Sequence, residues 1–261
     1  MSTLQFAADY LRHRLQSKTR HGVHSPFVYQ LVDEVIYDFR AKADYATIEQ
    51  LRAVLKQDQR TITITDLGAG SHVNNNKQKA VKTLAKNALK PPHLAQLIYR
   101  LANRFQPNNV VELGTCLGLT TAYLSAAVPN AALTTMEGCP ETAAVAKENL
   151  EKLNIKNAEI QVGNFDHLLP QYLSKQDQID FMFIDGNHRK DATIDYFQQS
   201  LPKVHEGSVL IFDDIYWSKG MKEAWKTIKS HPQVTCTVDL FWIGLVFFRK
   251  GQAKEHFKIR Y

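Results

Sequence analysis

The fold is decided by one stretch, Val110-Val111-Glu112-Leu113-Gly114-Thr115-Cys116-Leu117-Gly118-Leu119-Thr120-Thr121, which is followed by apolar residues from 122 to 128. A β-type run with an acid, a glycine turn and hydroxyl residues that open a helix form the strand-to-helix turn at which nucleotide-type cofactors are seated. The spacing lacks the Gly-x-Gly-x-x-Gly that brings a backbone against a dinucleotide pyrophosphate, which disfavours a nicotinamide cofactor. The stretch therefore predicts the floor of a cofactor site, with an ordinary strand, turn and helix as the alternative.

The residues after this stretch alternate short apolar runs with helical patterns, as in a parallel sheet covered by helices on both faces. Strands are predicted at 109–113, 132–136, 159–162, 179–184 and 208–212. Helices are predicted at 117–128, at 140–153 and after the capping residue Ser218. The runs 234–238 and 242–248 flank Asp239-Leu240-Phe241 as a hairpin. The predicted fold class is a doubly wound α/β sheet, mostly parallel.

The first third of the chain differs from the rest in pattern and in charge. Apolar residues recur at helical spacing in 4–15 and 28–36, around a break in which Ser25 can cap the next helix and Pro26 can open it. Residues 1–91 hold 14 Lys and Arg against 8 Asp and Glu, whereas residues 92–261 hold 18 of each. We therefore expect a mainly helical extension or cap over 1–91, a catalytic domain over 92–250, and a C-terminal tail over 251–261. The basic extension either meets an acidic partner or is a solvated surface.

Composition and local patterns favour an enzyme of the cytoplasm. The content is 44% hydrophobic and 22% charged, and no apolar run reaches the roughly 20 residues of a membrane helix. The three cysteines have no Cys-x-x-Cys spacing, so neither a disulfide framework nor a cysteine zinc site is indicated. A second glycine-rich turn, Asp66-Leu67-Gly68-Ala69-Gly70-Ser71, precedes a lysine-rich helix and no second acidic strand end. We interpret it as lying outside the cofactor site.

The first stretch resembles motif I of class I S-adenosylmethionine-dependent methyltransferases, and its Glu-Leu-Gly-x-x-x-Gly-x-Thr form is similar to the catechol-type O-methyltransferases. This resemblance implies S-adenosylmethionine (SAM) as co-substrate and a Rossmann-like sheet closed by an antiparallel hairpin. It implies that Glu112 faces the methionine amino group. Thr120 and the helix start after Gly114 and Gly118 suit the methionine carboxylate, an anion at the positive end of a helix dipole.

Two later strand ends complete the cofactor motifs. Glu137 follows Glu112 by 25 residues, where a carboxylate can accept two hydrogen bonds from a ribose diol, and the resemblance gives it that role. Asn164, Phe165 and Asp166 match the turn that contacts adenine in the family, with Asp166 as acceptor for the adenine amine. Asn164 is also a candidate cap of the next helix, and both roles are compatible.

A second group of candidate residues follows the fourth and fifth predicted strands, in Asp185-Gly186-Asn187-His188 and Asp213-Asp214. The resemblance to metal-dependent O-methyltransferases implies that Asp185, Asp213 and Asp214 bind a divalent cation such as Mg²⁺, and that His188 is the general base beside Asp185. The family carries Asp-Asn where this chain has Asp213-Asp214, and catechol enzymes carry Lys at the position of His188. In the alternative, Asp214 caps or precedes the next helix, and Asp185 and His188 act as acid and base without metal.

These residues predict an enzyme that methylates a hydroxyl of a small molecule. The first rival is a nucleic-acid methyltransferase, which the pI of about 9.1 favours. Against it, the sequence lacks the Asn/Asp-Pro-Pro-Tyr type motif after strand four. The second is a non-catalytic SAM-binding protein, which has no need of a base at His188. Nucleic acid and membrane are disfavoured as partners, and a homo-oligomer is compatible with the sequence. Trp217 and Phe241-Trp242 either wall the acceptor site or are core aromatics, and His21 and His24 are either ligands or loop residues.

Overall fold

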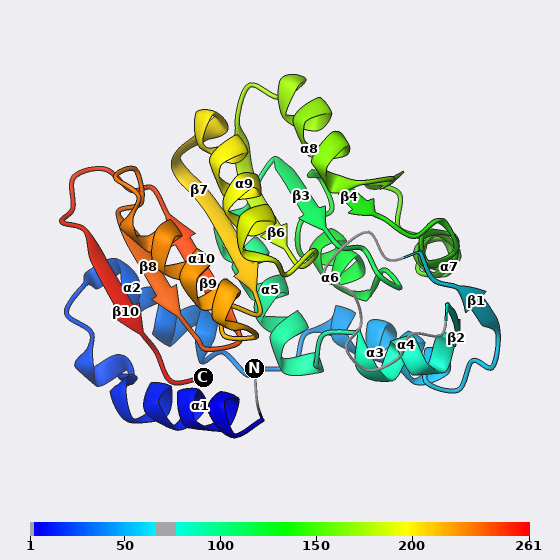
Figure 1. The fold of residues 1–261 in the computed structure, drawn as a ribbon, viewed down its shortest axis with the longest axis horizontal. Coiled ribbons are helices and arrows are strands. Elements are labelled where there is room, and N and C mark those ends of the chain that lie inside the picture. The colour runs from blue at the N-terminus through cyan, green and yellow to red at the C-terminus, as the bar shows by residue number, and fades with distance from the viewer. Residues whose placement is uncertain (1–2, 66–76) are drawn as a thin grey trace. The chain divides into compact units, whose positions relative to one another are not determined.

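The computed structural model describes residues 3–65 and 77–261, and the chain divides into two compact units (Figure 1). The central unit comprises residues 40–168, and the split unit comprises residues 1–39 together with 169–261. The predicted second glycine-rich turn, 66–71, lies outside the described residues. Among residues 3–65 and 77–261, no helix combines the length and apolar character needed to cross a membrane.

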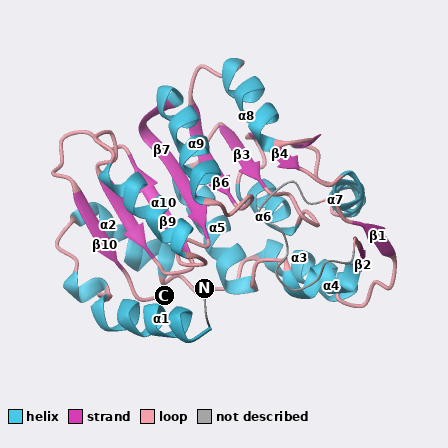
Figure 2. Cartoon of the chain, in the orientation of Figure 1, coloured by secondary structure: helices cyan, strands magenta, loops and turns pink. Residues whose placement is uncertain are grey.

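The central unit is built on three parallel strands in the order β3-β4-β5, of which β3 and β4 are labelled in Figure 2. These strands are β3 (Asn109–Leu113), β4 (Ala132–Glu137) and β5 (Ala158–Val162). The helices are α3 (Ala43–Leu55), α4 (Val81–Asn87), α5 (Pro92–Phe105), α6 (Leu119–Ala127), α7 (Pro140–Lys152) and the start of α8 (Phe165–Ser174). Two short strands, β1 (Thr61–Thr63) and β2 (Gln78–Ala80), pair antiparallel. Each of the three parallel strands is followed by a helix, as the sequence pattern predicts.

The split unit holds five strands in the order β10-β8-β9-β7-β6. They are β6 (Ile179–Ile184), β7 (Val204–Asp213), β8 (Cys236–Asp239), β9 (Ile243–Phe247) and β10 (Glu255–Lys258). The helices are α1 (Thr3–Gln16), η1 (Arg20–Gly22), α2 (Pro26–Gln30), η2 (Leu31–Ile36), α9 (Lys190–Ser200), η3 (Leu201–Lys203) and α10 (Lys219–Ser230). The pairs β6·β7 and β8·β10 are parallel, whereas β9 runs antiparallel to both β7 and β8.

Local sequence explains why these strands form. All six residues of β6, Ile-Asp-Phe-Met-Phe-Ile, are buried. A parallel strand that is covered on both faces needs a nearly continuous apolar run, and this segment supplies one. Ser218 caps α10 by accepting the Met221 N–H, and Ser25 accepts the Val28 N–H ahead of Pro26 in the first turn of α2. Both caps agree with the predicted helix starts. The predicted hairpin is confirmed as the antiparallel pair β8 and β9.

The mostly parallel strands, flanking helices and antiparallel pair confirm the predicted α/β, Rossmann-like fold class. The compact units do not follow the predicted boundaries at 91 and 250, because residues 3–39 pack with 169–261. Residues 255–258 of the predicted tail form the strand β10, whose pairing with β8 satisfies backbone groups that a tail would leave to water. Whether residues 1–91 act as a cap stays a prediction.

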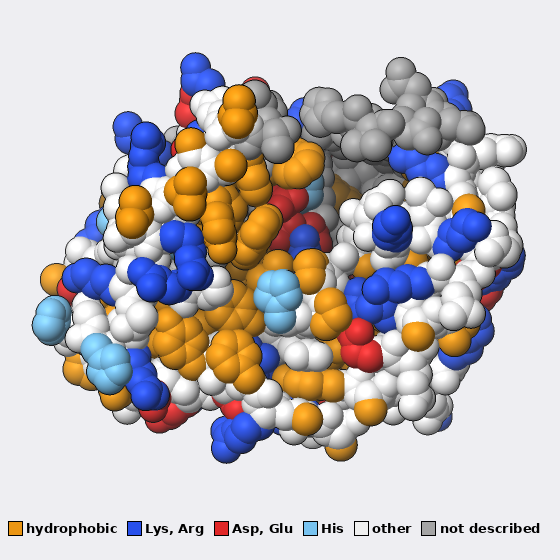
Figure 3. Space-filling view, turned by 90° about the horizontal axis from the view of Figure 1, so that it is seen from below, with side chains coloured by type: hydrophobic (Ala, Val, Ile, Leu, Met, Phe, Trp, Pro, Cys, Tyr) orange, Lys and Arg blue, Asp and Glu red, His pale blue; other side chains and the backbone are white. Residues whose placement is uncertain are grey.

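On one face of the molecule, the basic side chains of the described residues lie among other side chains. Figure 3 shows one face of the molecule, on which Lys and Arg side chains are interspersed with apolar and neutral side chains. Several of the basic residues are engaged in ion pairs, among them Arg60 with Asp58 and Glu148, and Lys222 with Asp9. On this face the described basic residues form no continuous stripe, and whether the basic N-terminal part meets an acidic partner stays open.

Candidate active site

The turn after β3 depends on two glycines with left-handed backbone angles. Gly114 has φ 102° and Gly118 has φ 81°, a region that residues with a side chain rarely adopt. Gly118 is the N-cap of α6, and a Cβ there would lie 3.4 Å from the Cβ of Ala146 on α7. The glycine therefore allows both the turn and the close approach of α6 to α7. Thr120 lies in the first turn of α6 and is nearly buried.

Glu112 lies within β3, one residue before its end, and is fully buried. Its Oε2 accepts hydrogen bonds from the hydroxyls of Thr121 on α6 and of Thr135, its register partner on β4, the latter at 2.7 Å. Its Oε1 has no hydrogen-bond partner among the described residues, although buried carboxylate oxygens normally have one. Burial raises the pKa of Glu112 to about 7, and the two hydroxyls oppose that shift. One buried oxygen is therefore available to a donor or cation from a ligand.

Glu137 is the last residue of β4, and its carboxylate joins two turns. One oxygen accepts the Cys116 N–H at 2.8 Å, from the turn after β3, and the other accepts the Cys139 N–H at 2.9 Å. These two backbone donors fix the position of a half-buried carboxylate. A carboxylate oxygen has two lone pairs and can accept more than one hydrogen bond, as joint contacts to a backbone N–H and a diol would require.

The turn after β5 combines a helix cap with two candidate contact residues. The Asn164 side chain accepts the Asp166 N–H at 3.0 Å, and its carbonyl accepts the His167 N–H, so the capping role proposed for Asn164 is present. Phe165 is half-buried and Asp166 is exposed. The cofactor role of both residues stays a prediction.

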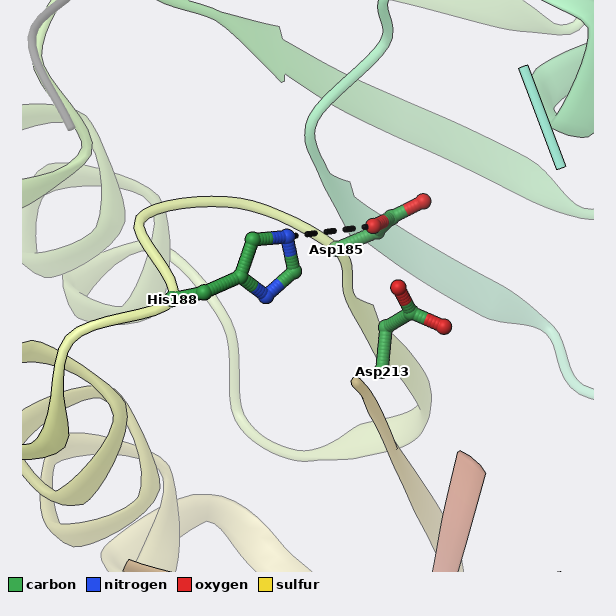
Figure 4. A group of neighbouring side chains, drawn as sticks. All are labelled: Asp185, His188 and Asp213. Atoms are coloured by element: carbon green, nitrogen blue, oxygen red, sulfur yellow. Dashed lines mark ion pairs between the residues drawn. The ribbon is translucent and has the colours of Figure 1, made fainter. Parts of the chain in front are cut away.

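A second cluster lies in the split unit, where β6 and β7 end. The ligating atoms of Asp185, His188 and Asp213 all lie within 4.8 Å of one another (Figure 4). His188 Nε2 is 3.6 Å from Asp185 Oδ1, while Asp213 is almost fully buried. Figure 4 shows the His188 ring turned toward the Asp185 carboxylate, with Asp213 rising beside it from the next strand. The cluster therefore combines a titratable ring with two carboxylates at one point.

The loop that carries His188 is held by Asn187. Asn187 adopts φ 49°, its Nδ2 donates to the Tyr196 hydroxyl at 2.9 Å, and its Oδ1 accepts from Arg189 Nε at 2.8 Å. Asn tolerates the left-handed region better than most residues, which explains this residue type at the bend. These contacts set the direction in which the next residue, His188, leaves the backbone.

Asp214 lies beside His188 but does not belong to the three-residue cluster. Its backbone has φ 53°, and its N–H donates to the Trp242 carbonyl at 2.8 Å, which ties the end of β7 to the β8–β9 turn. Its Oδ2 lies 3.9 Å from His188 Nε2. The side chain thus approaches the base, but Asp214 is not among the residues whose ligand atoms converge within 4.8 Å. Its predicted role as a metal ligand stays a prediction.

Aromatic residues of α1 pack against the β8–β9 turn, a feature that sequence reasoning missed. Phe6 and Tyr10 lie 5.2 and 5.0 Å from the Phe241 ring, and Phe6 lies 5.8 Å from the Trp242 ring. Phe241 is buried as a core aromatic, whereas Trp242 is half-buried and Trp217 is 49% exposed. The spacing of Phe6, Tyr10 and His13 is helical and was the available signal. The exposed His21 and His24 form no described contact that would make them ligands of this cluster.

The sequence of the chain matches known methyltransferases over its middle part. A family model described as "Methyltransferase domain" matches residues 111–215. A catechol O-methyltransferase of Niastella koreensis is 31% identical over 127 residues, which are 48% of this chain and 57% of that protein. An O-methyltransferase of Aspergillus flavus is 31% identical over 113 residues, which are 41% and 45% of the two chains. The chain therefore spans about half the length of the curated relatives it matches.

Solved structures show the same fold over more of the chain. An O-methyltransferase from Bacillus cereus, solved in complex with SAH, is 17% identical at a TM-score of 0.57 and covers 90% of this chain and 99% of its own. The O-methyltransferase TomG from Streptomyces achromogenes, solved in complex with SAM, is 18% identical at a TM-score of 0.57 and covers 85% and 95%. Identities this low support the fold alone. Residues 111–215 thus match a methyltransferase domain, and the chain resembles O-methyltransferases in sequence over its middle part and in fold.

Proposed function

We propose that this chain is a SAM-dependent methyltransferase that transfers a methyl group to a hydroxyl of a small molecule. The observation that carries the proposal is the placement of His188 beside Asp185 and Asp213, because a non-catalytic protein has no need of a base among carboxylates. The similarity of residues 111–215 to methyltransferase domains supports the same reaction class.

In this proposal the central unit binds SAM. The unpartnered Oε1 of Glu112 accepts from the methionine ammonium, whose positive charge keeps the buried carboxylate ionised. The methionine carboxylate lies at the start of α6, near Thr120, where backbone N–H groups and the helix dipole favour an anion. Glu137 accepts the ribose hydroxyls, and Asn164, Phe165 and Asp166 contact adenine. The acceptors of the central unit, buried at Glu112, half-buried at Glu137 and exposed at Asp166, thus match the polar groups of SAM in kind.

The split unit supplies the base. His188 Nε2 takes the proton of the acceptor hydroxyl, and the acceptor oxygen forms a bond to the SAM methyl carbon as the bond from that carbon to sulfur breaks. The sulfonium thereby loses its positive charge and leaves as a neutral thioether. Asp185, 3.6 Å from His188, stabilises the protonated imidazole that results.

We also propose that Asp185, Asp213 and Asp214 hold a divalent cation, with Mg²⁺ as the first candidate. Asp185 and Asp213 offer carboxylate oxygens in one cluster, and Asp214 brings a third carboxylate to within 3.9 Å of His188. Hard cations prefer oxygen ligands, and the negative charge of these side chains favours a cation. A bound cation of this kind supplies Lewis-acid chemistry that lowers the pKa of a hydroxyl. Asp214 in place of the family's Asn adds a negative charge, which strengthens cation binding and weakens that acidifying effect.

The N-terminal residues are proposed to shape the acceptor site. Phe6 and Tyr10 of α1 pack on the turn that contains Trp242, and Trp242 is bonded through its carbonyl to Asp214, next to the catalytic cluster. An acceptor with an aromatic or sugar ring can lie against such a wall. This gives residues 1–91 the cap role expected from the sequence, through the part that belongs to the split unit.

Transfer of a methyl group from SAM to a panel of diols, catechols and sugars, followed by mass spectrometry, tests the proposal. The His188→Ala variant should lower kcat by roughly 10²–10⁴-fold while SAM affinity stays nearly unchanged. The matched control is His21→Ala, an exposed histidine of the split unit outside the cluster. Full activity of the His188→Ala variant would rule out His188 as the general base. Full activity in excess chelator would rule out a metal requirement and leave Asp185 and His188 as an acid/base pair.

A further inference from the structure

A cavity of about 450 Å³ lies in the split unit, apart from the Asp185–His188–Asp213 cluster. Its lining comes from the segment after α1, from the end of α10, and from the strands β8 and β10. The segment is fixed to the sheet, because the Lys18 N–H donates to the Lys258 carbonyl and the Arg260 N–H donates to the Lys18 carbonyl. The cavity is therefore held by backbone hydrogen bonds and is of a size that binds small molecules.

The side chains that line this cavity carry an excess of unpaired positive charge. Lys18, Lys229 and Lys258 all line it. Among the described residues, the ammonium groups of Lys18 and Lys229 form no ion pair or hydrogen bond, and Lys258 donates only to the neutral Gln16 amide oxygen. Elsewhere in this unit lysines find carboxylates, as Lys190 does with Glu223 and Lys222 with Asp9. Three lysines without a carboxylate partner around one cavity are the feature to explain.

Two carboxylates line the same cavity and compensate this charge only in part. Asp239 is 1% exposed and fully engaged: it pairs with His13 at 3.0 Å and accepts from the Tyr216 hydroxyl and the Phe241 N–H. Glu255 is exposed and pairs with none of the three lysines within 4 Å among the described residues. The cavity therefore keeps a net positive charge.

Neutral donors complete the lining. His256 lines the cavity and its Nδ1 bonds the Thr237 hydroxyl at 2.8 Å, which leaves Nε2 without a partner among the described residues. Burial lowers the pKa of Lys229, the charge of Asp239 opposes this, and the charge of Lys258 adds a smaller lowering. Burial is also the main cause that lowers the pKa of His256, and the charges of Lys229 and Lys254 add to it. A bound anion would oppose both shifts, because it favours the charged forms.

We propose that this cavity is a second ligand site, which binds a small molecule through a phosphate or diphosphate group. Lysine ammonium groups act as point charges that neutralise the oxygens of a phosphate, which carries up to two negative charges and offers more acceptor oxygens than a single carboxylate. The hydrogen-bonded pair of His256 and Thr237 leaves one further donor at the same wall. None of the residues proposed for methyl transfer lines this cavity, so the proposal stands whether or not that function holds.

Calorimetry with inorganic pyrophosphate as the probe tests the site in the full-length chain. The wild type should bind one pyrophosphate, and the affinity should fall as salt is raised, because the interaction is between charges. The Lys229 Nζ lies 5.6 Å from the centroid of the Trp225 ring, and Lys229→Met keeps an unbranched apolar side chain there while it removes the ammonium, so it should weaken pyrophosphate binding by about tenfold or more. Lys226→Met is the matched control: Lys226 is exposed on the same helix and does not line the cavity, so its affinity should match the wild type.

Further variants and probes separate the competing explanations. Lys258→Met should weaken pyrophosphate binding in the same way. Circular dichroism shows whether each variant is folded, and the second variant keeps the proposal testable if Lys229→Met is not. A dicarboxylate of similar size should bind more weakly than pyrophosphate. Absence of saturable pyrophosphate binding at millimolar concentration overturns the proposal. So does an equal loss in Lys226→Met, since this would point to a diffuse basic surface for a polyanion such as RNA.

Discussion

The Glu112→Gln substitution tests whether a buried carboxyl in β3 is held near its neutral form in the free protein. Burial raises its pKa from 4.5 to about 7. Between these pH values the folded chain keeps a proton that the unfolded chain has released, so the free energy of unfolding of the wild type falls as the pH rises through this window. A difference of about 2.5 pKa units corresponds to about 3 kcal/mol.

The Gln variant cannot titrate at this position, so its own cost is the same at every pH. It keeps one oxygen for Thr121 and Thr135 but places an amide donor where Oε1 lay unpartnered, which lowers stability at low pH. Between pH 4.5 and about 8, the stability of the variant relative to the wild type should therefore increase by about 3 kcal/mol, with the change centred between the two pKa values.

Urea unfolding of both proteins across this pH range, without cofactor, measures the difference. Glu151→Gln on α7 is the matched control, because Glu151 is exposed in the same unit. Its stability relative to the wild type should show no comparable pH dependence. A stability difference between the wild type and the Glu112→Gln variant that stays flat from acid to neutral pH would refute the reasoning, because Glu112 would then be ionised in both states.

Three further predictions follow from the split unit. Asp239→Asn should lower the free energy of unfolding by about 3 kcal/mol in urea titrations, because it breaks a buried pair with His13; a loss below about 0.5 kcal/mol, typical of surface changes, would contradict this. Tyr10→Ala should raise the KM of the acceptor and spare SAM affinity, whereas Leu11→Ala, exposed on the same helix, should change neither. Asp214→Asn should raise the Mg²⁺ concentration needed for half-maximal activity, and an unchanged requirement would exclude Asp214 as a ligand.

Helix α1 illustrates what periodicity predicts and what it leaves open. The recurrence of Leu4, Leu11 and Leu15 predicts a helix over this segment, and the helix is present. The leucine stripe faces solvent, because Leu4, Leu11 and Leu15 are 84%, 62% and 85% exposed. The stripe that packs against the protein contains Phe6 and Tyr10, which contact Phe241. Two stripes of similar character share one helix, and only the shape of the distant β8–β9 turn decides between them.

The candidate site also contains some features that the sequence predicts and others that it does not. Asp185, His188 and Asp213 could be placed together from sequence, because residues that end adjacent strands converge at one edge of a sheet. The unpartnered Oε1 of Glu112 could not, since it depends on Thr135 lying opposite Glu112 in the β3–β4 register and on the orientation of α6. Strand β10 was missed because Glu255-His256-Phe257-Lys258 is too short and too polar to signal a strand, and its pairing with β8 supplies the stabilising contacts.

The central claim, that the central unit binds SAM through Glu112 and Glu137, is tested most directly by calorimetric titration of SAM into the full-length chain. The wild type should bind SAM at one site. Glu137→Ala should weaken that binding by about 1.5–3 kcal/mol, or roughly 10- to 150-fold in Kd, because a charge-assisted hydrogen-bonding group is lost. Absence of saturable SAM binding by the wild type at millimolar concentration would contradict the claim, and an unchanged affinity in Glu137→Ala would contradict the ribose assignment.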